Sequence, residues 1–235
     1  MKSISMDSSF LKRIEYYLEF ARKHPKHFSN NAESVRIVFD PQKIYAAEQA
    51  SLLRNQALGL PPEGSQVGII SEDPWVTVIR DAVEFSDGDI RLHTRTMNRN
   101  NEGVAVLPVF ENQIILIRHF RHALRKSILE IPRGAIDENA TLEQTARNEL
   151  LEEIEGVAGE LIPLGFIYGT TNLFANGSYL FFTQLISLGS PQLDEGVEAI
   201  EHYSVKEFES LLLAGEIQET HTISAFCQAR LRGLL

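Results

Sequence analysis

The stretch EIPRGAIDENATLEQTARNELLEEIEGV, residues 130–157, contains the strongest local pattern in this sequence and decides the expected fold. Its second half is predicted to be a helix. Thr141 and Gln144 have the spacing of a capping box, in which each side chain bonds the other residue's backbone at a helix start. No Gly or Pro falls between Thr141 and Glu155, and Leu, Ala, Glu and Arg, all good helix formers, dominate the segment.

The predicted helix has an apolar stripe with carboxylates beside it. At about 100° per residue, the stripe consists of Leu142, Ala146, Leu150 and Ile154. Glu149, Glu152 and Glu153 are spaced i, i+3 and i+4, so their side chains are neighbours on one helix face. Glu149 and Glu153 fall at the edge of the stripe, where a core boundary is expected.

Carboxylates crowded at a core boundary repel one another and lose hydration. Such a cluster is unfavourable unless a cation is shared among its members. Hard divalent cations such as Mg²⁺ bind oxygen ligands and combine a few carboxylates with water and substrate phosphates. The alternative is a solvated acidic helix face, and the spacing E-x-x-E-E does not by itself distinguish the two.

The residues before the helix favour the metal site. Gly134 follows a short apolar run and begins the loop that leads into the helix. From Gly134 onward the sequence resembles the signature of the Nudix hydrolases, G-x5-E-x7-R-E-U-x-E-E-x-G-U, where U is apolar. Glu149, Leu150, Glu152 and Glu153 match the R-E-U-x-E-E block at the family's distance from the glycine. The resemblance implies that Glu149, Glu152 and Glu153 bind a divalent metal.

The match departs from the signature at three positions. Ala140 stands where the family has its first Glu, Asn148 where it has Arg, and Glu155 where it has the late Gly. In the family that Arg braces the glutamates through ion pairs, so its loss leaves the cluster less compensated. Arg147 is adjacent in sequence but lies about 100° away around the helix, which makes it an imperfect substitute.

The flanking sequence resembles one branch of the family, the ADP-ribose pyrophosphatases, over roughly residues 73–235. The matching segments are IRHFR at 117–121, LEIP at 129–132, PLGFIY at 163–168, GEI at 215–217 and TI at 222–223. This resemblance implies an α+β fold, a Nudix-type α/β/α sandwich with a mixed sheet. Residues 1–74 have no recognised counterpart, and their pattern predicts a mainly helical N-terminal extension of unknown role.

Local signals place the individual elements. Helices are predicted at residues 8–24, 41–58, 204–214 and 221–231. Strands are predicted at residues 35–39, 75–85, 90–96, 104–110, 113–118, 161–168 and 179–186. Pro108 lacks a backbone N–H and therefore suggests an edge or a bulge in its strand. We accordingly expect two domains, residues 1–74 and 75–235.

Four charged residues flank the predicted metal site. Arg118 and Arg121 occupy positions that hold the nucleotide part of the substrate in the family, with a solvated basic strand edge as the alternative. Glu130 matches a family Glu that contacts substrate or supports metal, with an ordinary strand-end carboxylate as the alternative. The backbone carbonyl of Arg133 matches a family metal-ligand position. The side chain of Arg133 stands where a small residue is commoner, and it either pairs with phosphate or lies on the surface.

The general base is the least determined part of the site. Some relatives carry a Glu in the loop after Tyr168, but here residues 169–178, GTTNLFANGS, contain no acid. Other relatives place the base in a later loop similar to residues 193–198, LDEGVE, which makes Glu195 and Glu198 the candidates. The alternative is a mobile acidic loop. The distance decides between the two, because a base must come within about 3 Å of the water it activates.

Composition narrows the class of partner and the compartment. The 235 residues carry a formal net charge of −10, which argues against a nucleic-acid polymer or an anionic membrane as the main partner. A small phosphorylated substrate remains compatible, because a metal ion can invert the local field. Cys227 is the single cysteine; it fits a reducing cytoplasm and is expected to be a buried core thiol. No apolar run approaches ~18 residues, so no transmembrane helix is expected.

The resemblance implies a hydrolase that splits the pyrophosphate bond of a nucleoside diphosphate sugar with Mg²⁺, or with Mn²⁺ as the alternative. ADP-ribose is the expected substrate, giving AMP and ribose 5-phosphate. Relatives are homodimers that exchange N-terminal strands, so residues 75–96 are expected to cross to a partner subunit. The alternative function is a Nudix-fold module that binds a nucleotide without turning it over, supported by Ala140, Asn148 and the acid-free loop after Tyr168.

Overall fold

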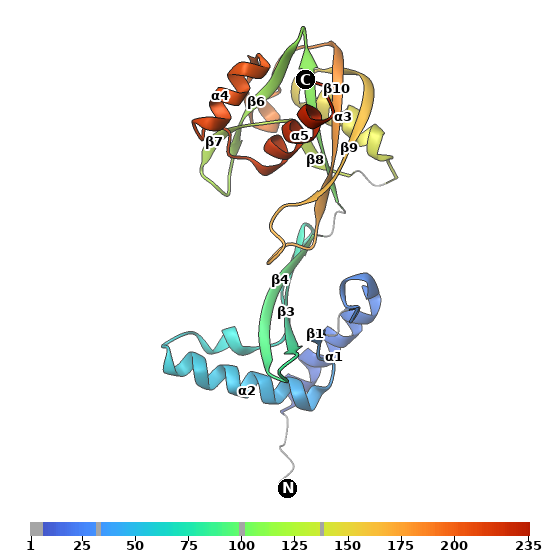
Figure 1. Ribbon diagram of the computed structural model, residues 1–235. Coiled ribbons are helices and arrows are strands. Elements are labelled where there is room, and N and C mark those ends of the chain that lie inside the picture. Colours follow the sequence, from blue (N-terminus) through green and yellow to red (C-terminus); the bar gives the residue numbers. More distant parts are fainter. Residues whose placement is uncertain (1–6, 32–33, 99–101, 137–138) are drawn as a thin grey trace. The chain divides into compact units, whose positions relative to one another are not determined.

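The computed structural model describes residues 7–31, 34–98, 102–136 and 139–235. The chain forms two compact units. The N-terminal unit comprises Met1–Arg99 with Thr170–Ala175, and the C-terminal unit comprises Asn100–Gly169 with Asn176–Leu235. This division differs from the expected boundary after residue 74, because the strands predicted at residues 75–85 and 90–96 share a sheet with the N-terminal strands (Figure 1).

The N-terminal unit combines helices with a small antiparallel sheet. Its described elements are α1 (Ser8–Lys23), η1 (Pro25–His27), β1 (Val35–Ile37), α2 (Pro41–Ala57), η2 (Pro62–Ser65), β2 (Gly68–Glu72), β3 (Val76–Phe85) and β4 (Ile90–Asn98). β1 pairs with the end of β3 and β2 with its start, while β4 pairs along nearly its whole length. The extension expected to be mainly helical is therefore part of a mixed helix and sheet unit.

The core of the N-terminal unit lies between the two long helices and the sheet. Ile14 and Tyr17 of α1 and Ile44 of α2 are buried in one cluster with Ile79 and Ala82 of β3. α1 and α2 each contribute buried apolar side chains to this cluster against the sheet. This cluster lies wholly within the N-terminal unit, so the unit has a core of its own.

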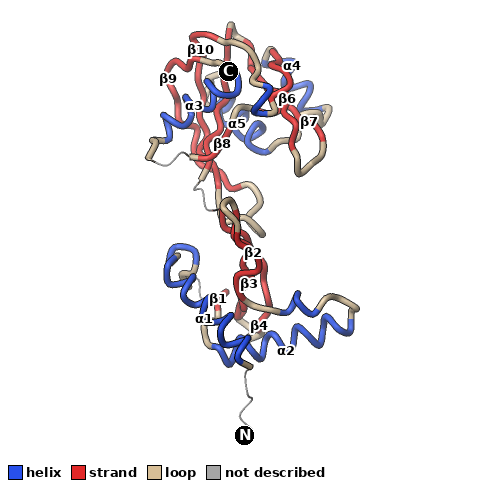
Figure 2. The backbone as a smooth tube through the Cα atoms, turned by 180° about the vertical axis from the view of Figure 1, so that it is seen from behind, coloured by secondary structure: helices blue, strands red, loops and turns tan. Residues whose placement is uncertain are grey.

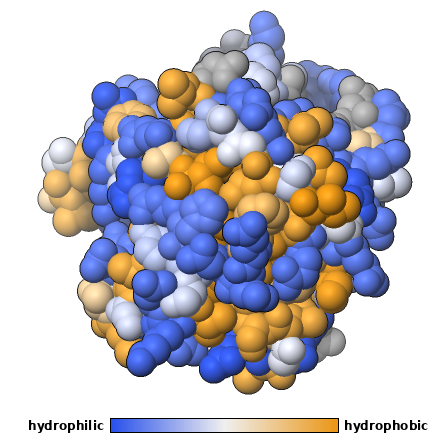
Figure 3. Space-filling model, turned by 90° about the horizontal axis from the view of Figure 1, so that it is seen from above, coloured by the Kyte–Doolittle hydropathy of each residue, from blue (hydrophilic) through white to orange (hydrophobic). Residues whose placement is uncertain are grey.

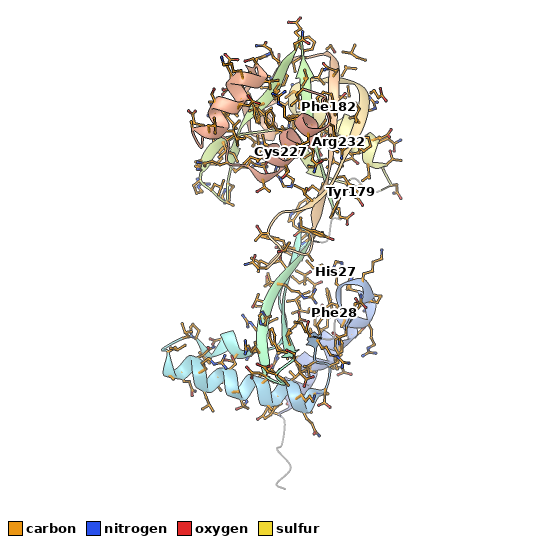
Figure 4. The ribbon with its side chains drawn as sticks, in the orientation of Figure 1. His27, Phe28, Tyr179, Phe182, Cys227 and Arg232 are labelled. Atoms are coloured by element: carbon orange, nitrogen blue, oxygen red, sulfur yellow. The ribbon has the colours of Figure 1, made fainter. Side chains whose placement is uncertain are left out.

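A buried ionic network joins α1 to the sheet. Tyr17 Oη donates to Asp81 Oδ1 at 2.6 Å, and Arg95 Nε donates to Asp81 Oδ2 at 2.6 Å. Asp81 is 2% exposed. The guanidinium carbon of Arg95 lies 4.5 Å from the ring centroid of Phe28, which follows His27 at the end of η1 (Figure 4). Burial and the neighbouring Asp81 raise the pKa of Tyr17 far above its usual value, so the phenol remains a donor.

The C-terminal unit is built around a mixed sheet. Its described elements are β5 (Gly103–Phe110), β6 (Gln113–Arg121), β7 (Lys126–Glu130), β8 (Arg133–Ala135), α3 (Leu142–Ile154), β9 (Val157–Tyr168), β10 (Gly177–Ser187), η3 (Leu193–Glu195), β11 (Val197–Tyr203), α4 (Val205–Leu213) and α5 (Thr220–Leu231). The strand order is β11-β6-β5-β10-β9, with β7 paired to β6 and β8 paired to β5. Figure 2 shows the strands in red and the helices in blue. β5 and β10 run parallel, whereas the other described pairs in this sheet are antiparallel.

Helices cover both faces of this sheet. Side chains of β5 alternate between the two faces. Leu107 lies in one hydrophobic core with Phe208 of α4 and Phe226 of α5, and Val106 lies in another with Leu150 of α3. One core therefore occupies each side of the sheet. The expected α+β class, with an α/β/α sandwich around a mixed sheet, is confirmed.

Pro108 lies in an interior strand, so the expected edge position is wrong. β10 pairs with one side of β5 from Gly103 to Val109. On the other side, Val106 N donates to Pro132 O, and the pairing with β6 begins only at Val109. The nitrogen of residue 108 points to the same side as that of residue 106. It therefore lies between the β8 and β6 ladders, where the missing N–H removes no ladder bond.

β9 lies at one margin of the sheet, and two arginines bind its carbonyl groups. The ladder between β9 and β10 contains register shifts, which leave backbone oxygens without strand partners. Arg147 of α3 donates to the carbonyls of residues 158–159 at 2.8 and 2.9 Å. Arg232, just beyond α5, donates to the carbonyls of residues 163–164, both at 2.7 Å (Figure 4). Arg147 therefore stabilises the sheet margin and does not replace the Arg that braces the glutamates in the family signature.

Cys227 is exposed, so the expected buried thiol is wrong. The buried face of α5 consists of Thr222, Ala225, Phe226 and Ala229, and Cys227 lies outside that stripe.

Figure 3 shows hydrophilic and hydrophobic residues interspersed over the face seen from above. Within the described ranges, no helix combines the length and the hydropathy needed to cross a membrane.

Candidate active site

Helix α3 begins and ends with side chains that satisfy backbone groups. Thr141 and Gln144 form the predicted capping box. The predicted apolar stripe is confirmed, because Ala146, Leu150 and Ile154 are fully buried. At the other end, Glu155 adopts a left-handed conformation with φ of 49°, which normally favours Gly. The Glu155 carboxylate accepts a hydrogen bond from Ser190 N at 3.1 Å, which partly offsets the strain at the position where the family has Gly.

The glutamates of α3 differ in their burial. Glu153 is 5% exposed, Glu149 is partly buried, and Glu152 is exposed. Gly134 in β8 faces Glu149, and a Cβ added at Gly134 would lie 1.9 Å from Glu149 Oε1. Only glycine allows the β8 backbone to approach this carboxylate so closely. This approach gives a physical reason for the glycine that opens the signature.

The carboxyl group of Glu153 is surrounded by groups that disfavour its ionisation. Burial, followed by the negative charge of Glu149, raises the pKa of Glu153 to about 8. Glu153 Oε2 accepts a hydrogen bond from Arg133 N at 3.2 Å, which opposes this shift only in part. Glu153 is therefore largely protonated at neutral pH in the metal-free protein. A divalent cation beside it would favour the ionised form.

Glu130, at the end of β7, is the centre of a second charged cluster and is fully buried. His119 Nδ1 lies 3.1 Å from Glu130 Oε1, Arg133 Nη2 lies 3.3 Å from Oε2, and Arg121 Nη2 is ion-paired with Oε1. Burial alone would raise the pKa of Glu130, but the contact with His119 and the charges of the two arginines lower it overall. Glu130 is therefore ionised at neutral pH, unlike Glu153.

Several buried polar atoms in this cluster have unused hydrogen-bonding capacity. Nε and Nη2 of Arg121, Nε of Arg133, Nδ1 of His119 and Oε1 of Glu130 are close to opposite charges but make no well-aligned hydrogen bond. Buried polar groups without such partners are uncommon and often mark sites that bind a ligand. The cluster adjoins a pocket of about 330 Å³ whose wall includes Arg121 and Arg133.

The first turn of α5 contributes residues that no sequence pattern distinguished. Glu219 caps this helix, and its Oε2 accepts a hydrogen bond from Thr222 N at 2.8 Å. Its Oε1 is paired with His221 Nδ1 and lies 3.9 Å from Arg133 Nε. Burial would raise the pKa of Glu219, but His221, Arg133 and the Thr222 N–H lower it to about 2. The one signal in this region was the resemblance of residues 215–217 and 222–223 to the family's last helix.

The two arginines predicted to hold the nucleotide are not brought together. Arg121 joins the Glu130 cluster, whereas Arg118 Nε donates to Glu201 Oε1 of β11 at 2.7 Å. Glu201 is also bonded by Tyr203 Oη. Successive side chains of a strand point to opposite faces of the sheet, so residues 118 and 121, three positions apart on β6, lie on opposite faces. Of the two, Arg121 is the better placed to contact a ligand near the glutamates.

The two candidate bases lie on a segment beside the site. Glu195 ends η3 and Glu198 lies in β11, a strand where the sequence suggested a loop, and both side chains are exposed. Val197 pairs with His119 across the β11 and β6 ladder. A Cβ added at Gly196 would lie 3.3 Å from His119 Nε2. The backbone of this segment therefore passes close to the Glu130 cluster.

The arrangement fits a divalent cation that completes its coordination from substrate and water. Within the part of the chain that the structure describes, no three His, Cys, Asp or Glu side chains form a metal site by themselves. Glu149 nevertheless lies close enough to Glu153 for its negative charge to raise the pKa of the Glu153 carboxyl group. Mg²⁺ commonly binds one or two carboxylates and takes its remaining oxygens from water and phosphate. The pair therefore suits Mg²⁺, with Glu152 one turn from Glu149 on the exposed side.

Comparison with known proteins places these observations in a family. Residues 99–225, more than half of the chain, match the family described as the NUDIX domain. The chain is 32% identical over 79 residues to the ADP compounds hydrolase NudE of Escherichia coli (strain K12), covering 34% of this chain and 42% of that protein. The match thus spans less than half of NudE. The chain is also 27% identical over 158 residues to the ADP-ribose pyrophosphatase of Bacillus subtilis (strain 168), covering 65% of this chain and 84% of that protein.

The fold resembles that of a solved structure described as an ADP compounds hydrolase. The TM-score is 0.62 and the identity 24%, over 72% of this chain and 93% of that chain. The family match contains the glutamate helix, the glycine of β8 and the Glu130 cluster. On these grounds the chain belongs to the Nudix family of hydrolases.

Proposed function

We propose that this Nudix hydrolase splits the pyrophosphate bond of a nucleoside diphosphate linked to a sugar, with ADP-ribose as the first candidate. The observation that carries the proposal is that two groups of charged side chains lie next to each other. One is the carboxylate pair Glu149 and Glu153, and the other is Arg121 and Arg133, which both bind buried Glu130. The names of two relatives, an ADP compounds hydrolase and an ADP-ribose pyrophosphatase, support a substrate that contains ADP. The products would be AMP and ribose 5-phosphate.

Mg²⁺, or Mn²⁺ in its place, is the proposed cofactor. The ligands would be Glu149, Glu152, Glu153 and the backbone carbonyl of Arg133. When bound, the cation neutralises phosphate charge and lowers the pKa of a coordinated water. The raised pKa of Glu153 supports this assignment, because a buried carboxyl group beside another carboxylate gains most from a nearby cation.

The chain's own residues would bind and orient the diphosphate. Arg121 and Arg133 lie on the wall of the 330 Å³ pocket, together with the apolar side chains Leu124 and Ile128. Guanidinium groups match the geometry of phosphate oxygens, and the apolar wall suits a ring. Glu130 would hold both arginines in place. This combination of charged and apolar walls supports a phosphate ester of a sugar or nucleoside.

Either Glu195 or Glu198 would serve as the general base. Both are exposed, and their segment passes His119, so a modest movement on substrate binding would bring one carboxylate to the site. Separate Glu195→Gln and Glu198→Gln variants distinguish them, since the base variant loses kcat and the other retains it.

The proposal also includes assembly and compartment. A homodimer that exchanges β3 and β4 is proposed on the family resemblance, and its mass can be measured by light scattering. A cytoplasmic location is proposed from the single cysteine, which excludes an intramolecular disulfide.

The deciding experiment incubates the protein with ADP-ribose and Mg²⁺ and measures AMP by chromatography. Glu153→Gln removes a proposed ligand and should lower turnover by about 10- to 100-fold or more. Glu143→Gln changes an exposed acid of the same helix and should leave turnover unchanged. Equal turnover in wild type and Glu153→Gln would refute the metal assignment.

The same assay tests the alternative function. Saturable nucleotide binding without AMP release, across a panel of nucleoside diphosphate sugars, would support a Nudix-fold binding module. Ala140 and Asn148 favour that alternative, because they stand where the signature has charged residues.

A further inference from the structure

Arg133 lies at a junction between the glutamate helix and α5. Its backbone N–H donates to Glu153 Oε2 at 3.2 Å, and its side chain lines the 330 Å³ pocket. One residue thus contacts a proposed metal ligand through its backbone and the pocket through its side chain. The direction of that side chain therefore determines which donors the pocket offers to a phosphate.

Two guanidinium groups share the carboxylate of Glu130. Arg121 and Arg133 both contact it, so one negative charge balances two positive ones. The second carboxylate near the guanidinium group of Arg133 belongs to Glu219, whose Oε1 lies 3.9 Å from Arg133 Nε. The Arg133 side chain is 29% exposed. Without Glu219, repulsion from Arg121 and the pull of hydration would favour an orientation toward solvent.

Glu219 is itself held by contacts from three directions. Its Oε2 accepts hydrogen bonds from Thr222 N at 2.8 Å and Thr222 Oγ1 at 2.9 Å. Thr222 Oγ1 in turn accepts from Ile131 N at 3.0 Å, which joins α5 to the backbone between β7 and β8. His221 Nδ1 donates to Glu219 Oε1, and His221 Nε2 lies 3.1 Å from Ser178 Oγ in β10. These contacts leave the carboxylate little rotational freedom.

We infer that Glu219 and His221 are positioning residues that hold the Arg133 side chain against the diphosphate of the substrate. The inference rests on the proposed function and deepens it by naming what sets diphosphate affinity in this chain. Arg133 supplies the donors, and Glu130 binds its Nη2. Glu219 faces its Nε and so sets the direction of the guanidinium together with Glu130, and His221 fixes Glu219. Because this contact is made in the ground state and the transition state alike, it acts on KM more than on kcat.

The test compares Glu219→Asp with wild type. Aspartate keeps the negative charge and caps a helix well, but its carboxylate is shorter by one methylene and withdraws from Arg133. The expected result is a thermal midpoint near that of wild type, a KM for ADP-ribose about 10-fold higher and a kcat within about two-fold. In an Arg133→Ala background, Glu219→Asp should add no further change, since the partner it positions is gone.

A second readout needs no turnover. The Nε proton of a held guanidinium exchanges slowly with water, and its NMR signal can be assigned to Arg133 by its loss in Arg133→Lys. In the substrate-free protein, Glu219→Asp and His221→Phe should each speed this exchange several-fold relative to wild type. His221→Phe removes the bond to Glu219 while leaving Glu219 itself in place.

The matched control is Glu207→Gln. Glu207 accepts hydrogen bonds from the N-cap Ser204 of α4, whereas Glu219 is itself the N-cap of α5; Glu207 lies on another helix and is exposed. It should change neither KM nor the Arg133 exchange rate. If Glu219→Asp changes neither KM nor the Arg133 exchange rate, the inference is overturned, although the proposed hydrolysis stands. A fall in kcat at constant KM would overturn the inference too. Absence of turnover in wild type would count against the proposed function, and the exchange measurement would still decide the inference.

Discussion

Glu130 and Glu153 are both buried, yet their surroundings shift their pKa values in opposite directions. Glu130 faces two arginines and His119, which lower its pKa, whereas burial and Glu149 raise that of Glu153 to about 8. The difference arises from the sign of the neighbouring charges, because both side chains are removed from water. The site therefore contains one carboxylate, Glu130, that is ionised at neutral pH, and one, Glu153, whose ionisation a bound cation would favour.

Glu153→Gln should change how stability depends on pH in the metal-free protein. A carboxyl group whose pKa is higher in the folded state stabilises the fold at low pH, and this contribution is lost as the pH rises from about 4.5 to about 8. Glutamine cannot ionise and keeps an oxygen for Arg133 N. The variant should therefore lie within about 1 kcal/mol of wild type near pH 5 and exceed it by on the order of 5 kcal/mol near pH 9.

Thermal unfolding in the presence of a chelator checks this at both pH values. Glu152→Gln is the control, because Glu152 is exposed and should leave the pH dependence as in wild type. Parallel pH profiles for wild type and Glu153→Gln would contradict the raised pKa.

Single elements of the fold depend on side chains that compensate for irregular backbone. β9 has register shifts against β10, and Arg147 and Arg232 bind the carbonyls at those places. β5 contains Pro108, which pairs with β10 on one side and faces the gap between the β8 and β6 ladders on the other. In β9 the unpaired carbonyl groups accept hydrogen bonds from arginines, and at Pro108 there is no N–H to satisfy. Neither irregularity therefore leaves an unsatisfied backbone group in the sheet.

Arg232→Ala should lower the free energy of unfolding by about 1–2 kcal/mol, because two carbonyl groups of β9 lose their partner. Arg232→Lys should recover only part of this loss, since an ammonium group lacks the planar fork that spans two oxygens. Denaturant unfolding measures both. Arg230→Ala, in the last turn of α5, removes exposed contacts with Glu209 and with the carbonyl of Leu235 and should cost less. A larger effect for Arg230 would contradict the assignment.

The molecule as a whole consists of two units with separate cores. The cluster around Tyr17 and Ile79 belongs to the N-terminal unit, and the clusters on both faces of the β5 sheet belong to the C-terminal unit. Segment Thr170–Ala175, between β9 and β10, belongs to the N-terminal unit, and Thr96 N donates to Leu173 O at 2.7 Å. Separate cores predict that a core substitution in one unit leaves the stability of the other largely unchanged.

Tyr17→Phe tests this separation. It removes the bond to Asp81, a buried carboxylate that also pairs with Arg95, and should destabilise the N-terminal unit by about 1.5–3 kcal/mol. Hydrogen exchange measured by mass spectrometry should show faster exchange in α1, β3 and β4, with β5 and β10 unchanged. Tyr16→Phe is the matched control, because its exposed bond to Glu72 should matter by less than about 0.5 kcal/mol. Uniformly faster exchange in both units would show that they unfold together.

Local patterns were sufficient for much of the fold. The capping box at Thr141, the apolar stripe of α3, the helix near residues 204–214 and the strands near residues 75–85 and 90–96 were all predicted and are present. Each depends on residues a few positions apart, so its physics is contained in short segments. The spacing of Glu149 and Glu153 and the resemblance around Gly134 also indicated the region of the site.

Other features arose from packing between distant segments. Glu130, Glu153 and Glu219 come from β7, α3 and α5, and their relation to Arg133 depends on how both helices pack on one sheet. No spacing in the sequence encodes such a distance, so the role of α5 and the separation of Arg118 from Arg121 could not be predicted. The same holds for the pKa of Glu153, since burial and neighbouring charge are properties of the assembled core and not of the helix that carries the residue.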